Sequence, residues 1–220
     1  MRQPVVLSWS GGKDSALALH ALLASSEYEP VGLLTTVTSD YDRISMHGVR
    51  RSLLERQARA LGLPLSVAEI RAGAGNEDYE ASMGAALVRL RDQGIRTVAF
   101  GDLFLEDVRR YREEMLARLG MRATFPLWGR DTAALAREFI ALGFGAVLVC
   151  VDSGSIDARF AGRDYDAALL ADLPPHADSC GEKGEFHTFV HRGPIFREPV
   201  PFSRGEVVAR DDRFHFCDLA

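Results

Sequence analysis

The stretch Val5-Val6-Leu7-Ser8-Trp9-Ser10-Gly11-Gly12-Lys13-Asp14-Ser15 decides the fold, because an apolar run leads through two glycines into a helical pattern. Residues 5–9 are typical of a buried strand, and the alanine- and leucine-rich segment 16–22 is typical of a buried helix. The two glycines let the backbone turn sharply and approach a ligand closely. The first N–H groups of the helix lie unpaired at the positive end of its dipole, so this junction predicts a site for a phosphate chain.

The side chains of this loop support the same interpretation. Lys13 adds a full positive charge, Ser10 and Ser15 add hydroxyl donors, and Asp14 is suited to hold a magnesium ion that bridges phosphate oxygens. A plainer alternative is a Gly-Gly turn in which Asp14 or Ser15 caps the helix. The combination of lysine, aspartate and serine after the glycines favours the phosphate site.

Two better-known phosphate motifs do not fit the spacing. A Walker A loop requires a glycine five residues before Gly12, where Leu7 stands, and a dinucleotide fingerprint requires glycines at 13 and 16. The pattern resembles instead the PP-loop of the N-type ATP pyrophosphatases. In that superfamily the loop grips the β- and γ-phosphates, which leave together as pyrophosphate while AMP goes to the substrate.

Composition sets limits on the class of protein. With 220 residues, 47% hydrophobic and 26% charged, the chain is an ordinary soluble globular protein and long for one minimal domain. The net charge of −5 argues against a nucleic-acid partner. There is no signal-peptide pattern and no long apolar stretch, so we expect a cytoplasmic protein without membrane contact. Three widely spaced cysteines suggest neither a disulfide framework nor a metal site.

Strand-like and helical patterns alternate along the chain. Apolar runs at 5–9, 31–37, 65–70, 97–100 and 146–151 alternate with helical patterns near 14–24, 49–61, 77–93, 105–119 and 132–142. This alternation predicts an α/β fold with a doubly wound, mostly parallel sheet of the Rossmann-like, adenine nucleotide alpha hydrolase type. Ligands of such sheets bind at the carboxyl ends of the strands, where the loop at Ser10 lies.

The amino-acid composition changes after about residue 174. Prolines and glycines separate short β-prone pieces at 188–191, 206–210 and 214–217, with Asp211-Asp212 as a hairpin turn. We expect a small mixed α/β appendage packed on the first domain. The predicted division is an ATP-binding domain at 1–125 and a substrate-side region at 126–220.

Several residues at strand ends are further candidates. Thr35 could contact the ribose or adenine, although threonine is also simply a good strand residue. Met46 and His47 precede a helix and could face the nucleotide, but a histidine there is more often a capping or surface residue. Gly101 allows close approach of a ligand where the fourth strand ends, and Asp102 could hold a hydroxyl or a metal or merely cap the next helix.

Two other segments carry charged candidates. Arg130 precedes a helix and could neutralise a phosphate or a carboxylate. The segment Cys180-Gly-Glu-Lys-Gly-Glu-Phe-His-Thr188 crowds carboxylates, a histidine and glycines into nine residues. Glu182 and Glu185 could orient an amine, bind metal or act as general base, and His187 could transfer a proton. We interpret this segment as a substrate site.

Taken together, these motifs resemble the diphthine–ammonia ligase family of PP-loop ATPases. The resemblance runs in order from Val5 to about Phe196 and includes segments 10–15, 101–103, 127–131 and 180–189, of which the C-G-E-x-G-E-[FY]-x-T-F element is the most specific. The family adenylates the carboxylate of diphthine, on a modified histidine of elongation factor 2, and ammonia then displaces AMP. The chain looks like a short variant without the extra C-terminal domains of larger eukaryotic members.

The resemblance implies that segment 10–15 binds the ATP phosphates, that Gly101-Asp102 lies by the nucleotide, and that segment 182–188 lies on the acceptor side. Together with the residue patterns described above, it gives the following expected roles. Lys13, Asp14, Glu182, Glu185 and His187 would be catalytic, and Asp14 and Asp102 would hold Mg²⁺. The expected nucleotide-binding residues are Ser10, Gly11, Gly12, Lys13, Asp14, Ser15, Thr35, Met46, Gly101 and Asp102, and the expected substrate residues are Arg130, Glu182, Gly184, Glu185 and Thr188.

The expected reaction takes ATP, ammonia or a small amine, and a carboxylate that is borne by a protein or a small molecule. Two alternatives stay open. A PP-loop enzyme that modifies tRNA would usually need paired cysteines or a basic appendage, which are not visible in the sequence. A non-catalytic ATP-binding sensor would not need the acidic segment 180–188. A homodimer also stays open.

Overall fold

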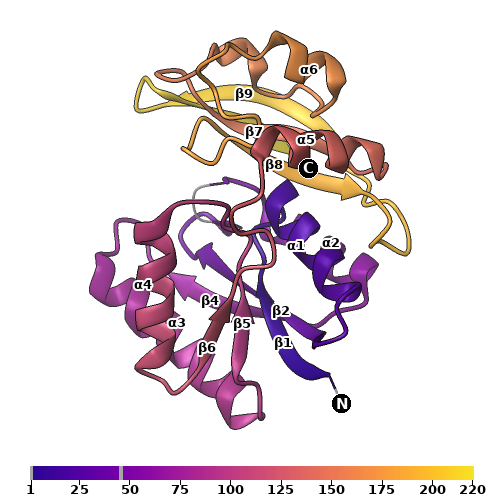
Figure 1. The fold of residues 1–220 in the computed structure, drawn as a ribbon. Helices are drawn as coiled ribbons and strands as arrows, with labels where there is room; N and C mark the ends of the chain where they lie inside the picture. Colours follow the sequence, from indigo (N-terminus) through magenta and orange to yellow (C-terminus); the bar gives the residue numbers. More distant parts are fainter. Residues whose placement is uncertain (1, 45–46) are drawn as a thin grey trace.

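The computed structural model describes residues 2–44 and 47–220, with residue 76 as backbone alone. Its N-terminal part is a sheet with flanking helices (Figure 1). The strands are β1 (Gln3–Ser8), β2 (Tyr28–Thr38), β3 (Arg43–Ile44), β4 (Leu65–Ile70), β5 (Thr97–Ala99) and β6 (Arg122–Thr124), and the helices are α1 (Lys13–Leu23), α2 (Arg51–Leu61), α3 (Asn76–Asp92) and α4 (Glu106–Ala117).

The N-terminal sheet is parallel except for its shortest strand, which confirms the predicted fold class. The parallel strands follow the order β4-β2-β1-β5-β6, and β3 pairs antiparallel with the end of β2. The winding therefore reverses between β1 and β5. In open sheets of this type, ligands bind outside the carboxyl ends of the strands at such a reversal.

Alternation along the strands divides the core into two layers. Val5 and Leu7 of β1 point into a cluster shared with α1 and α2, whereas Val6 points into a second cluster with Leu87 of α3 and Leu116 of α4. Successive side chains of a strand face opposite sides of a sheet, so a run of apolar residues buries both faces. The sheet is thus covered on both sides, as the sequence pattern predicts.

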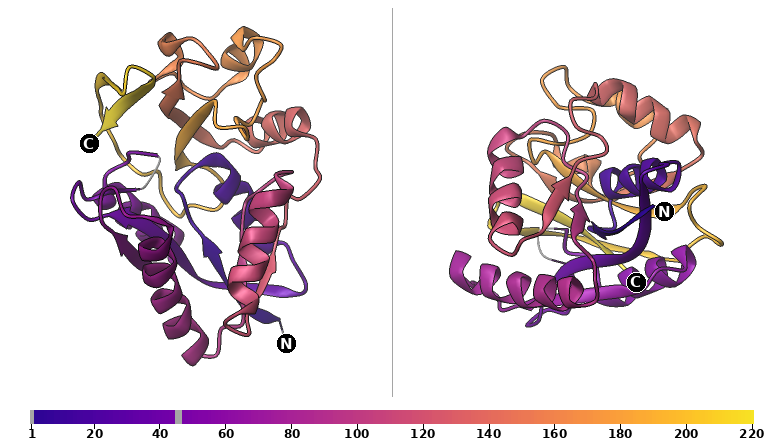
Figure 2. Two further views of the ribbon diagram at one scale, coloured as in Figure 1. Left: turned by 90° about the vertical axis from the view of Figure 1, so that its left-hand side faces the viewer. Right: turned by 60° about the horizontal axis from the view of Figure 1, so that its bottom comes forward.

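A second sheet lies on the far side of α1 and α2 (Figure 1; Figure 2, left). Its strands follow the order β8-β7-β10-β9 and all neighbours are antiparallel. The elements of this part are α5 (Thr132–Ala141), β7 (Gly145–Asp152), the 3₁₀ helix η1 (Ala158–Phe160), α6 (Ala167–Asp172), β8 (Phe186–Arg192), β9 (Arg204–Arg210) and β10 (Phe214–Leu219). The domain boundary near residue 125 stays a prediction.

The prediction that the strand at 146–151 belongs to the parallel sheet is wrong. This strand is β7, and it lies inside the antiparallel sheet rather than continuing the parallel one. All eight of its residues are buried, and four of them (Ala146, Leu148, Val149 and Val151) belong to one cluster with Phe139 of α5 and Phe189 of β8. A continuous apolar strand indicates that both faces of its sheet are covered. This pattern does not show whether the neighbouring strands run parallel or antiparallel to it.

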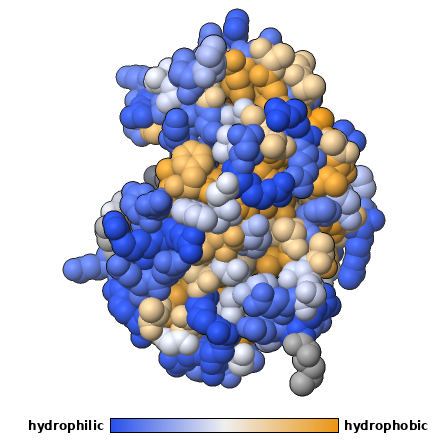
Figure 3. All heavy atoms as spheres, viewed as in Figure 1, coloured by the Kyte–Doolittle hydropathy of each residue, from blue (hydrophilic) through white to orange (hydrophobic). Residues whose placement is uncertain are grey.

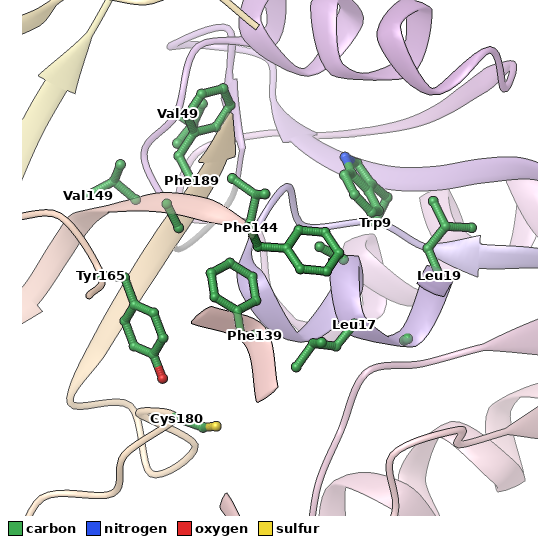
Figure 4. Close-up of a cluster of buried hydrophobic side chains, with 14 of the residues drawn as sticks. Trp9, Leu17, Leu19, Val49, Phe139, Phe144, Val149, Tyr165, Cys180 and Phe189 are labelled. Carbon is green, nitrogen blue, oxygen red and sulfur yellow. The ribbon is translucent and has the colours of Figure 1, made fainter. Parts of the chain in front are cut away.

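One hydrophobic core joins the two sheets. Leu17 of α1 packs in the same cluster as Phe139, Phe144 and Tyr165 of the C-terminal part (Figure 4). The rings of Phe139 and Phe144 stack with centroids 4.9 Å apart. Helix α1 therefore lies between the two sheets, and its N-terminus faces residues from both.

Two further features concern the outside of the molecule. Asp211 and Asp212 connect β9 to β10 with φ angles of +53° and +48°, which confirms the predicted hairpin turn. The face shown in Figure 3 carries both kinds of residue, with hydrophobic ones near α5 and α6 and across the middle of the view, and hydrophilic ones mainly along the edges. Among the residues described, no helix is both long enough and apolar enough to span a bilayer.

Candidate active site

A cavity of about 230 Å³ lies at the carboxyl ends of β1 and β5, where the two sheets meet. Twelve of the candidate residues line it: Ser10, Gly12, Lys13, Asp14, Ser15, His47, Gly101, Asp102, Glu182, Gly184, His187 and Thr188. The lining is completed by Ser8, Phe100, Arg112, Gly181 and Phe186. Distant parts of the chain thus meet where the winding of the sheet reverses.

Gly101 brings the end of β5 against the start of α1. A Cβ atom at this position would lie 2.9 Å from the carbonyl carbon of Asp14 and 3.1 Å from the backbone nitrogen of Ser15. Such distances leave no room for a side chain, so glycine is required for the close approach. The predicted close approach at Gly101 is to the phosphate loop itself, and it places Asp102 beside that loop.

The loop is fixed from behind by a buried glutamine. Gln57 of α2 accepts a hydrogen bond from Trp9 Nε1 at 2.9 Å and donates from Nε2 to the carbonyl oxygens of Gly11 at 3.0 Å and Val190 at 2.6 Å. The N–H of Val190 also donates to the carbonyl of Gly11 at 2.8 Å. Gly11 has φ +79° and lies behind the cavity lining, so its role is to shape the loop.

The C-terminal motif contacts the phosphate loop directly. The backbone N–H of Lys13 donates to Thr188 Oγ1 at 3.0 Å, and the N–H of Gly12 donates to Ser10 Oγ at 3.3 Å. Ser15 Oγ donates to the carbonyl of Gly12 at 2.9 Å. The N–H groups of Gly12 and Lys13, which we expected to bind an anion, therefore donate to hydroxyl groups of the protein in this structure.

A buried Lys13 and a partly exposed Asp14 form an ion pair at the N-terminus of α1. Lys13 Nζ lies 2.8 Å from Asp14 Oδ2, and Lys13 is only 3% exposed. Burial is the largest single effect and lowers the pKa of Lys13, but Asp14, Cys180 and Glu182 together outweigh it and raise the pKa above its usual value. Burial raises the pKa of Asp14, against the opposing effect of Lys13. The ammonium group of Lys13 is thus kept charged inside the site.

A second ion pair lies on the opposite part of the lining. Arg112 Nε lies 2.7 Å from Asp102 Oδ2, and Arg112 Nη2 donates to Asp102 Oδ1 at 3.0 Å. The guanidinium group also lies over the ring of Phe100, 4.4 Å from its centroid. Arg112 is not among the residues predicted for the site, because nothing in the local sequence of α4 indicates that this side chain turns toward the end of β5.

The two glutamates of the C-terminal motif have different environments. Glu182 lines the cavity, and its Oε1 accepts a hydrogen bond from the N–H of Leu103 at 2.7 Å. Burial raises its pKa to about 7, opposed by that hydrogen bond and assisted by the nearby carboxylates of Asp14 and Asp102. Glu182 is therefore a group that can take or give a proton near neutral pH.

Glu185, by contrast, lies outside the cavity lining. Its two carboxylate oxygens accept hydrogen bonds from the backbone N–H groups of Asp178 at 2.9 Å and Lys183 at 3.0 Å, and the residue is only 4% exposed. Both oxygens are thus engaged in shaping the loop that carries Glu182. Glu182 and Glu185, which the sequence pattern does not distinguish, therefore differ in position: only Glu182 lines the cavity.

Two histidines stack beside Gly12. The rings of His47 and His187 have centroids 4.4 Å apart at an angle of 30°. Burial and the charge of Lys13 lower the pKa of His187 to about 4, and burial together with His187 lowers the pKa of His47 well below its usual value. Both rings are therefore neutral at neutral pH. Met46, the other candidate of this segment, lies outside the described residues.

The remaining candidates lie away from the cavity. Thr35 is buried within β2, in register with Val67 of β4. Arg130 is ion-paired with Glu138 on α5 and does not reach the cavity lining. Cys180 Sγ donates a hydrogen bond to the carbonyl of Thr132. Burial raises the pKa of the Cys180 thiol to about 12, so this thiol has little nucleophilic character.

Comparison with known proteins fits this geometry. The model of the diphthamide synthase N-terminal domain matches residues 2–123, and that of the diphthamide synthase C-terminal domain matches residues 131–216. The chain belongs to the diphthamide synthase family. The predicted resemblance is thereby confirmed, and the family domains contain the phosphate loop and the C-terminal motif, respectively.

Curated diphthine–ammonia ligases are similar over most of the chain. A diphthine–ammonia ligase from Danio rerio is 27% identical over 92% of this chain and 88% of its own length. The human diphthine–ammonia ligase is 26% identical over 90% of this chain and 82% of its own length. That of Schizosaccharomyces pombe is also 26% identical, but only 36% of its length is covered.

Proposed function

We propose that the chain is an ATP-dependent ligase that adenylates a carboxylate, releases pyrophosphate and joins ammonia or a small amine to the acyl group. The observation that carries this proposal is that Lys13 of the phosphate loop and Glu182 of the C-terminal motif line one cavity. The first is a buried cation suited to phosphates, and the second is a carboxyl group suited to proton transfer. The name shared by the curated relatives, diphthine–ammonia ligase, supports a ligase that uses ammonia.

Lys13 is the residue that we assign to the first half of the reaction. The acceptor carboxylate attacks the α-phosphorus of ATP, the bond to the β-phosphate oxygen breaks, and negative charge grows on the departing pyrophosphate. A fixed ammonium group and the N-terminus of α1 stabilise that charge without reorganisation. The ion pair with Asp14 keeps Lys13 protonated and in place.

Glu182 is the residue that we assign to the second half. Ammonia attacks the acyl carbon, the bond to AMP breaks, and one proton must leave the new nitrogen. A carboxyl group with a pKa of about 7 is ionised in a substantial fraction of molecules at neutral pH, and so it can accept this proton. His187 is neutral at this pH and is suited to hydrogen bonding to the phosphates rather than to acting as an acid.

Magnesium is part of the proposal, and the fit rests on Asp14. Asp14 Oδ1 and Asp102 Oδ2 are both buried without a hydrogen-bond partner. Asp102 Oδ2 lies 2.7 Å from Arg112 Nε, whereas the ion pair of Asp14 with Lys13 uses its other oxygen, Oδ2, and leaves Oδ1 for a metal. The described residues hold no cluster of three or more histidine, cysteine or acidic side chains suited to a metal. Mg²⁺ is usually bound by one or two carboxylates together with substrate phosphates, so a single aspartate is sufficient. When bound, the ion would neutralise phosphate charge.

The relatives are named for diphthine, so diphthine on elongation factor 2 is the acceptor that we propose. The test is incubation with radiolabelled ATP, ammonium chloride and elongation factor 2 carrying diphthine. We expect AMP and pyrophosphate in equal amounts, together with an acceptor whose mass changes from acid to amide. Release of ADP and phosphate, or AMP release without acceptor modification, would contradict the proposal.

A further inference from the structure

Arg112 is a cavity residue to which the proposed reaction gives no role. It lies on α4, far along the chain from both motifs, and its side chain is 25% exposed at the cavity. Three contacts fix it: the two nitrogen–oxygen contacts to Asp102 and the ring of Phe100. A side chain held on two sides pays little further entropy when a ligand binds.

The contacts to Asp102 leave part of the guanidinium group for a ligand. Arg112 Nη2 donates a hydrogen bond to Asp102 Oδ1, and Nε is in ion-pair contact with Asp102 Oδ2. An arginine carries five N–H donors in a planar fork, so the Nη1 side remains for a second oxyanion. The pair with Asp102 is therefore compatible with a bound carboxylate and sets the orientation in which the guanidinium group meets it.

The charges around the cavity indicate what that ligand is. Among the described residues that line it, Lys13 and Arg112 carry full positive charges, and Asp14, Asp102 and Glu182 are acidic. The polyphosphate of ATP belongs at Lys13 and the N-terminus of α1. A second anion brought next to that polyphosphate would be repelled by it and by the acidic side chains, unless it has a cation of its own.

We propose that Arg112, oriented by Asp102 and Phe100, binds the carboxylate of the acceptor and presents it to the nucleotide. This assignment rests on the proposed function. The planar fork of arginine matches the two oxygens of a carboxylate, which a lysine cannot reproduce. The anion-binding arginine that the sequence reading sought at position 130 is thus at position 112, on another helix.

The experiment compares two arginines of the same helix. Arg112→Gln and Arg112→Lys change the cavity residue, and Arg110→Gln removes the same charge from an exposed position of α4. For each protein, the affinity for elongation factor 2 with and without diphthine is measured in the presence of a non-hydrolysable ATP analogue. The affinity for that analogue alone and the KM values for ATP and acceptor are measured as well.

We expect the wild type and Arg110→Gln to prefer the diphthine-bearing factor, and both Arg112 variants to lose this preference. The KM for the acceptor should rise about 10- to 100-fold in the Arg112 variants, with the affinity for the ATP analogue unchanged. A loss of nucleotide affinity instead would assign Arg112 to the phosphates and overturn the inference. Unchanged affinities for both ligands would make the pair with Asp102 merely structural and would also overturn it.

Failure of the proposed function gives a different result. The wild type would then release no AMP with the diphthine-bearing factor, whatever residue stands at 112. If AMP and amide form normally but the Arg112 variants still prefer the diphthine-bearing factor, the proposed function is supported and the inference about Arg112 is wrong. A wild type that binds both forms of the factor equally also contradicts the inference.

Discussion

The backbone N–H of Lys13 donates a hydrogen bond to the hydroxyl of Thr188, which is 175 residues away in the chain. This bond joins the first residue of α1 to β8 of the antiparallel sheet. Both partners are almost completely buried, at 3% and 2% exposure. The phosphate loop is therefore held in shape by the C-terminal motif, which makes the two motifs parts of one site.

Thr188→Val tests this link. Valine has nearly the shape of threonine but lacks the hydroxyl, so the buried N–H of Lys13 loses its acceptor. We expect the free energy of unfolding, measured by urea denaturation, to fall by about 1–3 kcal/mol. Thr188→Ser keeps the hydroxyl and should lose less. Equal losses in the two variants would show that the methyl group, rather than the hydrogen bond, matters at this position.

Gln57→Leu tests the support behind the loop. The variant leaves Trp9 Nε1 without its acceptor and the carbonyl of Val190 without the side-chain donor, both in a fully buried environment. We expect a loss of about 2–4 kcal/mol in the free energy of unfolding, since unpaired buried polar groups are costly.

The matched control for Gln57 is Gln93→Leu. Gln93 is exposed at the end of α3, and its replacement should change the free energy of unfolding by less than about 0.5 kcal/mol. If Gln57→Leu behaved like this control, the three side-chain hydrogen bonds of Gln57 would contribute nothing net to stability.

The elements around the phosphate loop could be predicted from sequence because their signals are local. An apolar run, two glycines and a helical pattern at 5–22 define a strand, a turn and a helix without reference to the rest of the chain. Gly101-Asp102 follows from the same rule, since parallel strands end at one edge of a sheet. Local patterns are sufficient for this half of the site.

Arg112 and the two glutamates show what local patterns leave open. The position of Arg112 depends on how α4 packs against Phe100, and the sequence of α4 alone does not determine this packing. Glu182 and Glu185 are chemically alike and three residues apart, and only the path of the turn sends one into the cavity and the other to backbone N–H groups. Roles that depend on side-chain direction require the tertiary structure.

Glu182→Gln should stabilise the folded protein at high pH. The pKa of Glu182 is raised in the folded state to about 7, so the folded protein binds more protons than the unfolded chain between about pH 4.5 and 7. Stability therefore falls as the pH rises through this window. Because glutamine removes the burial of a charge, we expect a gain of roughly 2 kcal/mol at pH 8 and much less at pH 5 in urea denaturation.

The same variant should lose activity. If Glu182 accepts the proton from the attacking amine, the wild-type kcat/KM should rise about tenfold per pH unit below about pH 7 and then level off. Glu182→Gln should be about 100-fold slower or worse and should lack this rise. A variant that is stabilised at high pH but has unchanged activity would show that the pKa of Glu182 is raised and that Glu182 does not accept the proton.

Asp14→Asn tests the magnesium assignment. Because Asp14 Oδ1 is buried without a hydrogen-bond partner, the loss of its charge should raise the Mg²⁺ concentration needed for half-maximal pyrophosphate release by about tenfold. Asp102→Asn is the matched comparison, and it should shift that concentration much less, since both oxygens of Asp102 face Arg112. Chelation of magnesium with EDTA should stop pyrophosphate release in all three proteins. If Asp102→Asn shifts the magnesium requirement more than Asp14→Asn does, the ion is held from β5 rather than from α1.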